Sequence, residues 1–91
     1  MHSASALVTG ASRGIGRAIA AELAARGFGL TITSRSEGDL RALRPALLDA
    51  GAPQVELVAA DLANRDAVEA TAKAHGATFK KYPPKDIGLG Q

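Results

Sequence analysis

Three glycines with a fixed spacing predict a binding site for a phosphorylated ligand near the start of this 91-residue chain. The segment TGASRGIG covers positions 9 to 16, with glycines at 10, 14 and 16. Glycine lets the backbone turn tightly and approach a diphosphate without a Cβ in the way. A helix that begins near Gly14 would add free N–H groups and the positive end of its dipole. The candidate anion-binding residues are Thr9, Gly10, Ser12, Arg13, Gly14, Ile15 and Gly16.

Two arginines beside these glycines favour the same interpretation. Arg13 and Arg17 lie at the expected helix N-terminus, where the dipole disfavours a cation by about 0.3–1 kcal/mol unless something negative is bound. The alternative is a structural turn with two solvated arginines. Nucleotide hydrolysis through a P-loop is not expected, because that motif requires a lysine where Arg17 follows Gly16.

The residues around the glycine turn must form a strand before it and a helix after it. Residues 6–8 are a short apolar run, typical of a strand buried on both faces of a parallel sheet. Apolar residues then recur every fourth position from 15 to 23, which predicts a helix that ends at Gly27. Residues 30–33 contain alternating β-branched side chains and predict a second strand.

A second helix is expected after this strand. Ser36 has the spacing of a helix N-cap, and leucines at positions 40, 43, 47 and 48 supply an apolar stripe. Pro45 interrupts the stripe, so the helix should kink or restart there before it stops at Gly51.

The remaining elements continue the alternation of strand and helix. Residues 55–59 predict a third strand, at a sheet edge because Glu56 lies between apolar neighbours. Asn64 can cap a last helix that ends at Gly76. This order predicts an α/β fold of the three-layer Rossmann type, in part only, with a parallel sheet and right-handed crossovers.

The glycine segment resembles the signature T-G-x-x-x-G-x-G of the short-chain dehydrogenase/reductase family, and it matches at positions 9, 10, 14 and 16. The resemblance extends to about residue 75. It implies a nicotinamide dinucleotide cofactor. It also places Ser34 and Arg35, after the second strand, and Asp61 and Leu62, after the third, against the adenosine part of that cofactor.

The charges near the second strand favour NADP(H) over NAD. An NAD site usually has an acid about 20 residues beyond the glycine turn, and this carboxylate would repel a 2′-phosphate. The chain has Ser34 and Arg35 there, and Arg13 on the facing loop could complete a clamp of two guanidinium groups. A solvated Arg35 is the alternative, because Glu37 is nearby.

Asp61 follows the third strand, at the carboxyl end of the sheet where ligands of open α/β folds bind. The resemblance implies that its side chain or the Leu62 amide meets the adenine. The alternative is a turn residue that bonds its own backbone. His2 and His75 have no partners at metal-ligand spacing, so we expect solvated histidines and no metal site.

The residues that the family uses for catalysis are missing. The resemblance implies a tyrosine followed four residues later by a lysine, an upstream serine and an Asn-Asn-Ala-Gly segment, and none of these occurs. Tyr82 and Lys85 are only three positions apart, with two prolines between them. We therefore predict the N-terminal dinucleotide-binding part of an NADP-dependent short-chain oxidoreductase, cut short after about residue 75 and inactive alone.

A noncatalytic nucleotide-binding or strand-pairing module is the alternative. In the usual strand order 3-2-1-4-5-6 the first strand is central, so a chain with three strands leaves its first strand as an open edge. That edge could pair with a second copy or with another chain. Nucleic-acid binding is not expected, because the folded part is nearly neutral and its single aromatic residue is Phe28.

Composition divides the chain into two parts. Residues 1–72 carry seven arginines against eight acids, whereas residues 73–91 carry four lysines against one acid. We expect residues 1–76 to form a partial NADP-binding Rossmann domain and residues 77–91 to form an irregular basic tail. There is no cysteine, no apolar stretch of about 18 residues and no signal-peptide pattern, which predicts a cytoplasmic protein without membrane contact.

Overall fold

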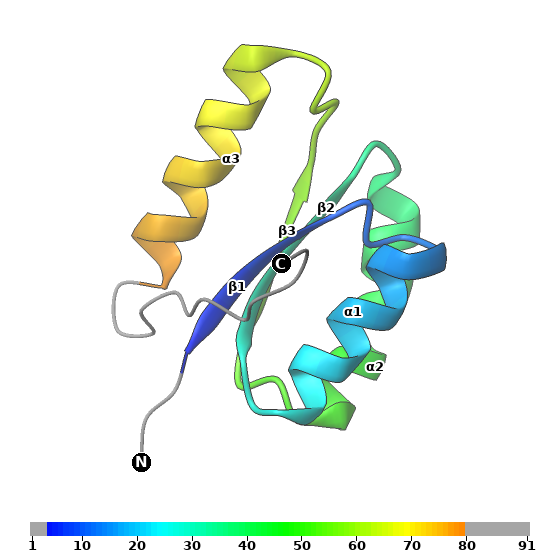
Figure 1. Cartoon of the computed structure of the whole chain (residues 1–91). Helices are drawn as coiled ribbons and strands as arrows, with labels where there is room; N and C mark the ends of the chain where they lie inside the picture. Colours follow the sequence, from blue (N-terminus) through cyan, green and yellow to red (C-terminus); the bar gives the residue numbers. More distant parts are fainter. Residues whose placement is uncertain (1–3, 80–91) are drawn as a thin grey trace.

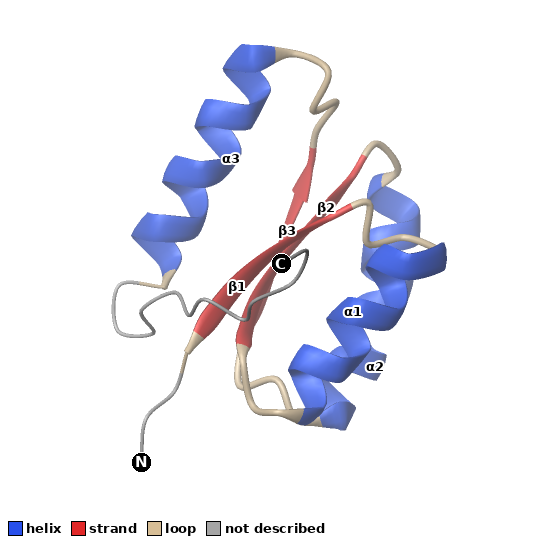
Figure 2. Cartoon of the chain, in the orientation of Figure 1, coloured by secondary structure: helices blue, strands red, loops and turns tan. Residues whose placement is uncertain are grey.

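A computed structural model describes residues 4–79, which form three strands and three helices in alternation. The elements are β1 (Ser5–Thr9), α1 (Gly14–Ala25), β2 (Gly29–Ser34), α2 (Glu37–Ala50), β3 (Val55–Ala59) and α3 (Arg65–Thr78). The strands are parallel, in the order β1-β2-β3. Helices α1 and α2 cover one face of the sheet, and α3 lies on the other (Figures 1 and 2). The predicted three-layer α/β fold is confirmed.

The main core lies between the sheet and the helices α1 and α2. Leu30 and Ile32, two residues apart on the central strand β2, are fully buried on this side. Full burial of each such side chain stabilises the fold by about 1.5–3 kcal/mol. The principal members of the core are Val8, Ala20, Leu23, Ala24, Leu30, Ile32, Leu40, Leu43, Leu47 and Val55. This packing fixes β1 and α1 relative to each other and so fixes the position of the turn between them.

Helix α2 is continuous through Pro45, so the expected restart there is wrong. The predicted cap is confirmed, since the Ser36 side chain accepts a hydrogen bond from the backbone N–H of Asp39. Pro45 lies on the exposed side of the helix, whereas Leu43 and Leu47 are buried on the other side. Water can satisfy the carbonyl that proline leaves without a donor, and the buried leucines hold the helix on the sheet.

Helix α3 continues past Gly76 to Thr78, so the predicted end at Gly76 is wrong. Asn64 caps its N-terminus as predicted, by accepting hydrogen bonds from two backbone N–H groups of the first turn. At the other end Phe79 is buried, with its ring over Gly29 of β2. This tertiary contact extends the ordered structure beyond the glycine. The division into a domain of residues 1–76 and a tail of residues 77–91 stays a prediction.

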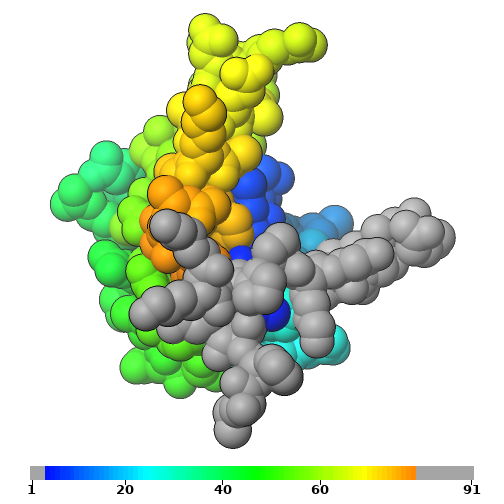
Figure 3. Space-filling view, turned by 90° about the vertical axis from the view of Figure 1, so that its left-hand side faces the viewer, coloured from blue at the N-terminus to red at the C-terminus, as the bar shows by residue number. Residues whose placement is uncertain are grey.

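The sheet face beneath α3 is more polar and less covered than the other face. Ser5, Thr31 and Thr33 are buried on it, but Leu7 is 37% exposed. The expectation that residues 6–8 are buried on both faces is therefore wrong at Leu7, because β1 is an edge of the described sheet. β3 forms the opposite edge, as predicted. Figure 3 shows α3, in yellow to orange, with its outer side open to solvent.

Within residues 4–79, none of the helices has both the length and the hydropathy that crossing a membrane requires.

Candidate functional site

Each glycine of the turn between β1 and α1 has its own structural role. Gly10 and Gly14 have φ angles of +62° and +63°, a region that other residues rarely adopt. A Cβ added at either would meet nothing within 4 Å, so the space beside both is open. A Cβ at Gly16 would instead lie 2.7 Å from the carbonyl carbon of Gly10 and 2.9 Å from the carbonyl oxygen of Thr9. Helix α1 therefore begins in direct backbone contact with the turn.

The N-terminus of α1 carries uncompensated positive charge. Arg13 is the N-cap residue, yet its side chain makes no capping hydrogen bond, and the first turn of the helix contains no acidic residue. The backbone N–H of Arg17 bonds back to the carbonyl of Arg13, but the N–H groups of the preceding turn have no partner within the helix. An anion at this position would satisfy these donors and the helix dipole together.

A cleft of 520 Å³ opens beside the turn, at the carboxyl ends of the three strands. It is lined by Thr9, Gly10, Ser12, Arg13, Thr33, Ser34, Arg35, Ser36, Asp39, Ala60, Asp61 and Leu62. The structure thus brings together all the predicted site residues except Gly14, Ile15 and Gly16, which lie in the first turn of α1. A second hollow of 610 Å³, between α2 and β3, contains none of them.

The two arginines of the cleft are available to a ligand. Among residues 4–79 there are two ion pairs, and neither includes Arg13 or Arg35. Glu37, the acid nearest to Arg35 in the sequence, pairs instead with Arg41 one turn further along α2. The structure therefore removes the main reason to expect that Arg35 is neutralised by its own neighbour.

Two carboxylates also line the cleft. Asp61 Oδ1 accepts a hydrogen bond from the backbone N–H of Ala63 at 3.0 Å, so this side chain does shape its own turn, which was the alternative interpretation. A carboxylate has further acceptor sites, so the bond does not occupy Asp61 fully. The second carboxylate is that of Asp39, which the sequence did not identify as a cleft residue. Its position in the first turn of α2, three residues after the N-cap Ser36, was the available signal.

Ser34 uses its side chain to hold the loop between β2 and α2. Its hydroxyl donates to the Ser36 carbonyl at 3.2 Å and accepts from the Ser36 N–H at 3.1 Å. These bonds fix the backbone on both sides of Arg35. The predicted contact of Ser34 with the cofactor stays a prediction.

The Thr33 hydroxyl lies unpaired beneath the cleft. Thr33 is fully buried, and its Oγ1 has no hydrogen-bond partner among the residues that the structure describes. Thr31, on the same face of β2, is equally buried, but its hydroxyl bonds His75 Nδ1 at 2.6 Å. Burying a hydroxyl without a hydrogen bond costs about 1–3 kcal/mol.

Replacing Thr33 with valine is therefore expected to raise the free energy of unfolding by about 1 kcal/mol, because the orphaned hydroxyl is removed at nearly constant shape. The matched change Thr31→Val should lower it by a similar amount, since the ring nitrogen of His75 loses its partner. Urea denaturation of both variants measures the difference. A loss of stability in Thr33→Val would show that its hydroxyl is bonded in solution.

His75 is not the solvated side chain that the sequence predicted. Its ring lies between α3 and the sheet, with Nε2 3.1 Å from Ser5 Oγ and Nδ1 2.6 Å from Thr31 Oγ1. The ring also packs against Phe79, with centroids 4.9 Å apart. Burial lowers the pKa of His75 below its ordinary value. His2 lies outside the described residues, and no group of three metal-ligating side chains occurs in residues 4–79.

Known proteins resemble this chain in both sequence and structure. The model of the short chain dehydrogenase family matches residues 4–82. D-erythrulose reductase of Gallus gallus is 44% identical over 71 residues, which cover 78% of this chain and 27% of that protein. The structure of a metagenomic short-chain oxidoreductase in complex with NADP matches with a TM-score of 0.77 at 39% identity, over 87% of this chain and 35% of the other.

A further structural match is the alcohol dehydrogenase from the archaeon Thermococcus sibiricus complexed with 5-hydroxy-NADP. It has a TM-score of 0.79 and 33% identity, over 86% of this chain and 33% of the other. The chain spans about a quarter of the length of the curated relatives that it matches. The family match over most of the sequence and the shared fold show that the chain belongs to the short chain dehydrogenase family.

Proposed function

We propose that this chain is the N-terminal dinucleotide-binding part of an NADP-dependent short-chain oxidoreductase. The observation that carries the proposal is the uncompensated N-terminus of α1. It opens beside a cleft that contains the guanidinium groups of Arg13 and Arg35, neither of which forms an ion pair with another of the residues 4–79. When bound, NADP(H) supplies or accepts the hydride that a carbonyl or alcohol substrate exchanges in the full enzyme.

The residues of the turn fit the diphosphate of such a cofactor. The absence of Cβ atoms at Gly10 and Gly14 leaves open space against the backbone, and the N–H groups of the first turn of α1 can donate to phosphate oxygens. Thr9 and Ser12 line the adjacent wall of the cleft. Ile15, 80% exposed in the same turn, offers an apolar surface beside them.

The opposite end of the cleft fits the adenosine. Asp61 and the Leu62 amide are suited to the adenine, by accepting from and donating to its ring edge. Arg35, presented by the loop that Ser34 holds, is suited to a 2′-phosphate together with Arg13. Asp39 in the same cleft opposes this phosphate, so the preference for NADP requires the two guanidinium groups to outweigh this one carboxylate, since Asp61 is assigned to the adenine.

Thermal unfolding of the 91-residue chain with added nucleotide tests the proposal. NADP at a hundredfold excess over its Kd should stabilise the fold by about 2.7 kcal/mol, and NAD at the same concentration should stabilise it less. Equal stabilisation by both nucleotides would contradict the NADP preference. No stabilisation by either would contradict dinucleotide binding itself.

The isolated chain should not catalyse hydride transfer, because it contains no tyrosine followed four residues later by a lysine. Tyr82 and Lys85, the nearest substitute, lie outside the described residues. NADPH oxidation by the pure chain in the presence of a carbonyl substrate would contradict this statement. A cytoplasmic location stays a prediction from the cysteine-free sequence.

A second candidate function, a noncatalytic pairing module, is favoured by the open edge at β1 of the described sheet. Leu7 on this strand is 37% exposed, and an unpaired strand edge is a template for another strand. Light scattering with and without NADP distinguishes the two functions. A stable dimer that responds to the nucleotide favours the pairing module, whereas a ligand-binding monomer favours the enzyme fragment.

A further inference from the structure

Helix α3 rests on the sheet with little apolar contact. Thr71 is its one buried residue, and Val68 is 44% exposed. The strand face beneath the helix carries the buried hydroxyl groups of Ser5, Thr31 and Thr33. Hydrophobic burial therefore contributes less to the docking of α3 than to that of α1 and α2, whose leucines and alanines fill the main core.

His75 supplies polar contacts that join α3 to two strands. Nε2 bonds Ser5 of β1, and Nδ1 bonds Thr31 of β2, residues that are 70 and 44 positions away in the sequence. Phe79, one turn later, packs on the same ring and on Gly29. These contacts tie the C-terminal half of α3 to the centre and to the β1 edge of the sheet.

The other end of α3 is continuous with the cofactor side of the cleft. Asp61 and Leu62 lie in the short loop between β3 and α3, at the end of the helix that projects beyond the sheet in Figure 1. The Asn64 N–H bonds the Asp61 carbonyl at 3.0 Å, and the Ala60 N–H bonds the Ser34 carbonyl at 2.9 Å. A shift of α3 on the sheet must therefore move or strain this loop.

We propose that His75 is a positioning residue: it docks α3 on the sheet, thereby places Asp61 and Leu62 in the cleft, and makes dinucleotide binding weaken when it takes up a proton. The inference rests on the proposed dinucleotide function and adds a dependence on pH to it. His75 lies at the far end of the helix from the cleft residues and acts only through the helix.

The two hydroxyl partners accommodate neutral His75 better than the cation. A neutral imidazole has one donor and one acceptor nitrogen, so one hydroxyl can accept while the other donates. In the cation both nitrogens donate, so the hydroxyl that had donated to the ring must find a new acceptor for its hydrogen, where Ser5 and Thr31 are only 1% and 0% exposed. Protonation should therefore loosen the contact of α3 with the sheet.

One charged residue shares the face of the sheet beneath His75, and the pKa of His75 is nevertheless lowered. The strands β1 and β2 present no titratable side chain on the face beneath α3. On β3, Glu56 is in register with Thr31 and is half-buried. On α3 itself, Glu69 and Lys73 are exposed. Burial is the cause that lowers the pKa of His75.

The direction of the pH effect on stability follows from this lowered pKa. The unfolded chain takes up the proton near the ordinary pKa of 6.5, before the folded chain does. The contribution of His75 to stability is therefore complete above this pH. It decreases as the pH falls below 6.5, until the lower pKa of the folded state is passed.

The test compares NADP dissociation constants of the 91-residue chain at pH 7.5 and 5.5. His75→Gln keeps a donor and an acceptor but does not titrate in this range, and His75→Leu removes both hydrogen bonds. The 2′-phosphate itself titrates near pH 6, as phosphate monoesters do, so the pH dependence of His75→Gln is the reference. His2→Gln, a change at the other histidine of the chain, is the matched control.

On acidification the wild type should lose about fivefold more affinity than His75→Gln, a coupling at the lower end of the usual range. His2→Gln should behave as the wild type, and His75→Leu should bind about fivefold more weakly at both pH values. The same pH dependence in the wild type and His75→Gln would overturn the positioning role. So would full retention of affinity in His75→Leu.

Amide hydrogen exchange separates this inference from the proposed function. At pH 5.5 the amides of α3 should exchange faster in the wild type than in His75→Gln, while those of β2 exchange equally. If no variant binds NADP at pH 7.5, the proposed function fails, yet the exchange rates still test the docking. Equal exchange of α3 in both proteins would overturn the role of His75 without any reference to ligand.

Discussion

Replacing Gly16 with alanine is expected to lower the free energy of unfolding by about 3 kcal/mol and to abolish NADP binding. The new Cβ would lie 2.7 Å from the carbonyl carbon of Gly10, which is backbone and cannot rotate away. Overpacking of a close contact costs about 1–3 kcal/mol, and a clash with backbone belongs at the upper end. Because stabilities of small domains start at about 5 kcal/mol, most of the stability would be lost.

Two other glycines provide matched controls for this change. The new Cβ of Gly38→Ala in α2 would have no atom within 4 Å, and the φ angle of Gly38 is one that alanine adopts readily. This change should therefore stabilise the protein by about 0.5–1 kcal/mol, because alanine has the higher helix propensity. Gly14→Ala also meets open space, but its φ of +63° should cost about 1–2 kcal/mol. Urea denaturation measures all three. A Gly16→Ala variant as stable as the wild type would show that α1 does not start against the turn.

The turn is also where the cofactor phosphates are proposed to bind. In Gly16→Ala the start of α1 must move away from Gly10, and the N–H groups of its first turn move with it. Thermal unfolding with and without NADP should then show no stabilisation by the nucleotide. If the variant folds and still binds NADP as tightly as the wild type, the phosphates lie elsewhere.

Replacing Arg35 with alanine is expected to weaken NADP binding about 10- to 100-fold and to leave NAD binding unchanged. Hydrogen bonds to charged groups contribute about 1.5–3 kcal/mol each. Within residues 4–79 Arg35 has no ion pair, and Glu37, its neighbour in sequence, pairs with Arg41. NAD lacks the 2′-phosphate, so it loses no such bond. Arg13→Ala should show the same selectivity. Isothermal titration with each nucleotide measures both constants.

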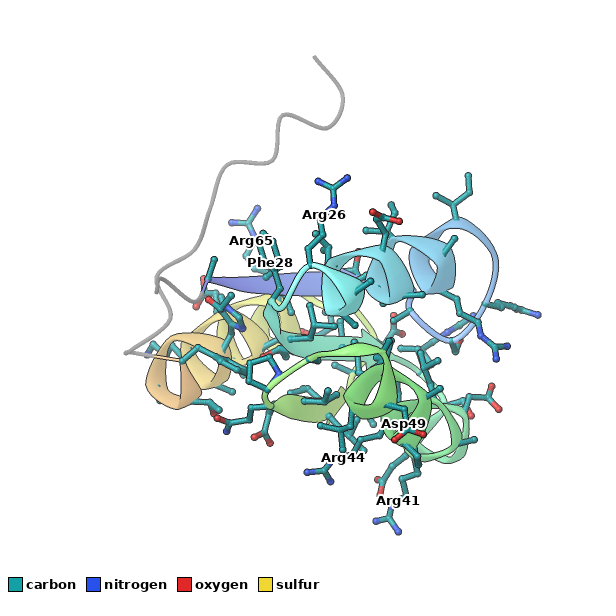
Figure 4. All side chains as sticks on the ribbon, turned by 90° about the horizontal axis from the view of Figure 1, so that it is seen from below. Arg26, Phe28, Arg41, Arg44, Asp49 and Arg65 are labelled. Carbon is teal, nitrogen blue, oxygen red and sulfur yellow. The ribbon has the colours of Figure 1, made fainter. Side chains whose placement is uncertain are left out.

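Arg44→Ala is the matched control for the loss of a positive charge. Figure 4 shows Arg44 and Arg41 projecting from α2 on the outer side of the helix, and Arg44 does not line the cleft. The control should bind both nucleotides as the wild type does. An equal loss of NADP and NAD affinity in Arg35→Ala would place this side chain on a part that both cofactors share, and the NADP preference would lose its physical basis.

The elements of the fold that are determined by residues adjacent in the sequence were predictable. The third strand occupies 55–59 as expected, and Ser36 and Asn64 cap their helices. In each case the signal is local, since capping bonds and β-branched runs involve residues only a few positions apart. Where the local rule failed, at Pro45 and Gly76, packing of distant side chains kept the helix intact.

The site was predictable to the same extent. The glycine motif and the positions that follow each strand predicted residues that share one cleft, because the carboxyl ends of parallel strands meet at one edge. The sequence did not reveal Asp39 as a cleft residue. It also did not show that Ser34 is bonded to its own loop or that Thr33 is left without a partner.

The sequence by itself determined the family, the strand–turn–helix order and the turn that only glycine can form, because these follow from backbone preferences of adjacent residues. Only the tertiary structure decided which charges are free and which polar groups are buried. Glu37 pairs with Arg41 and not with Arg35, and His75 of α3 forms hydrogen bonds with Ser5 and Thr31 of the sheet. Such pairings depend on which helix faces which strand, and residues 44 and 70 positions apart carry no local sign of it.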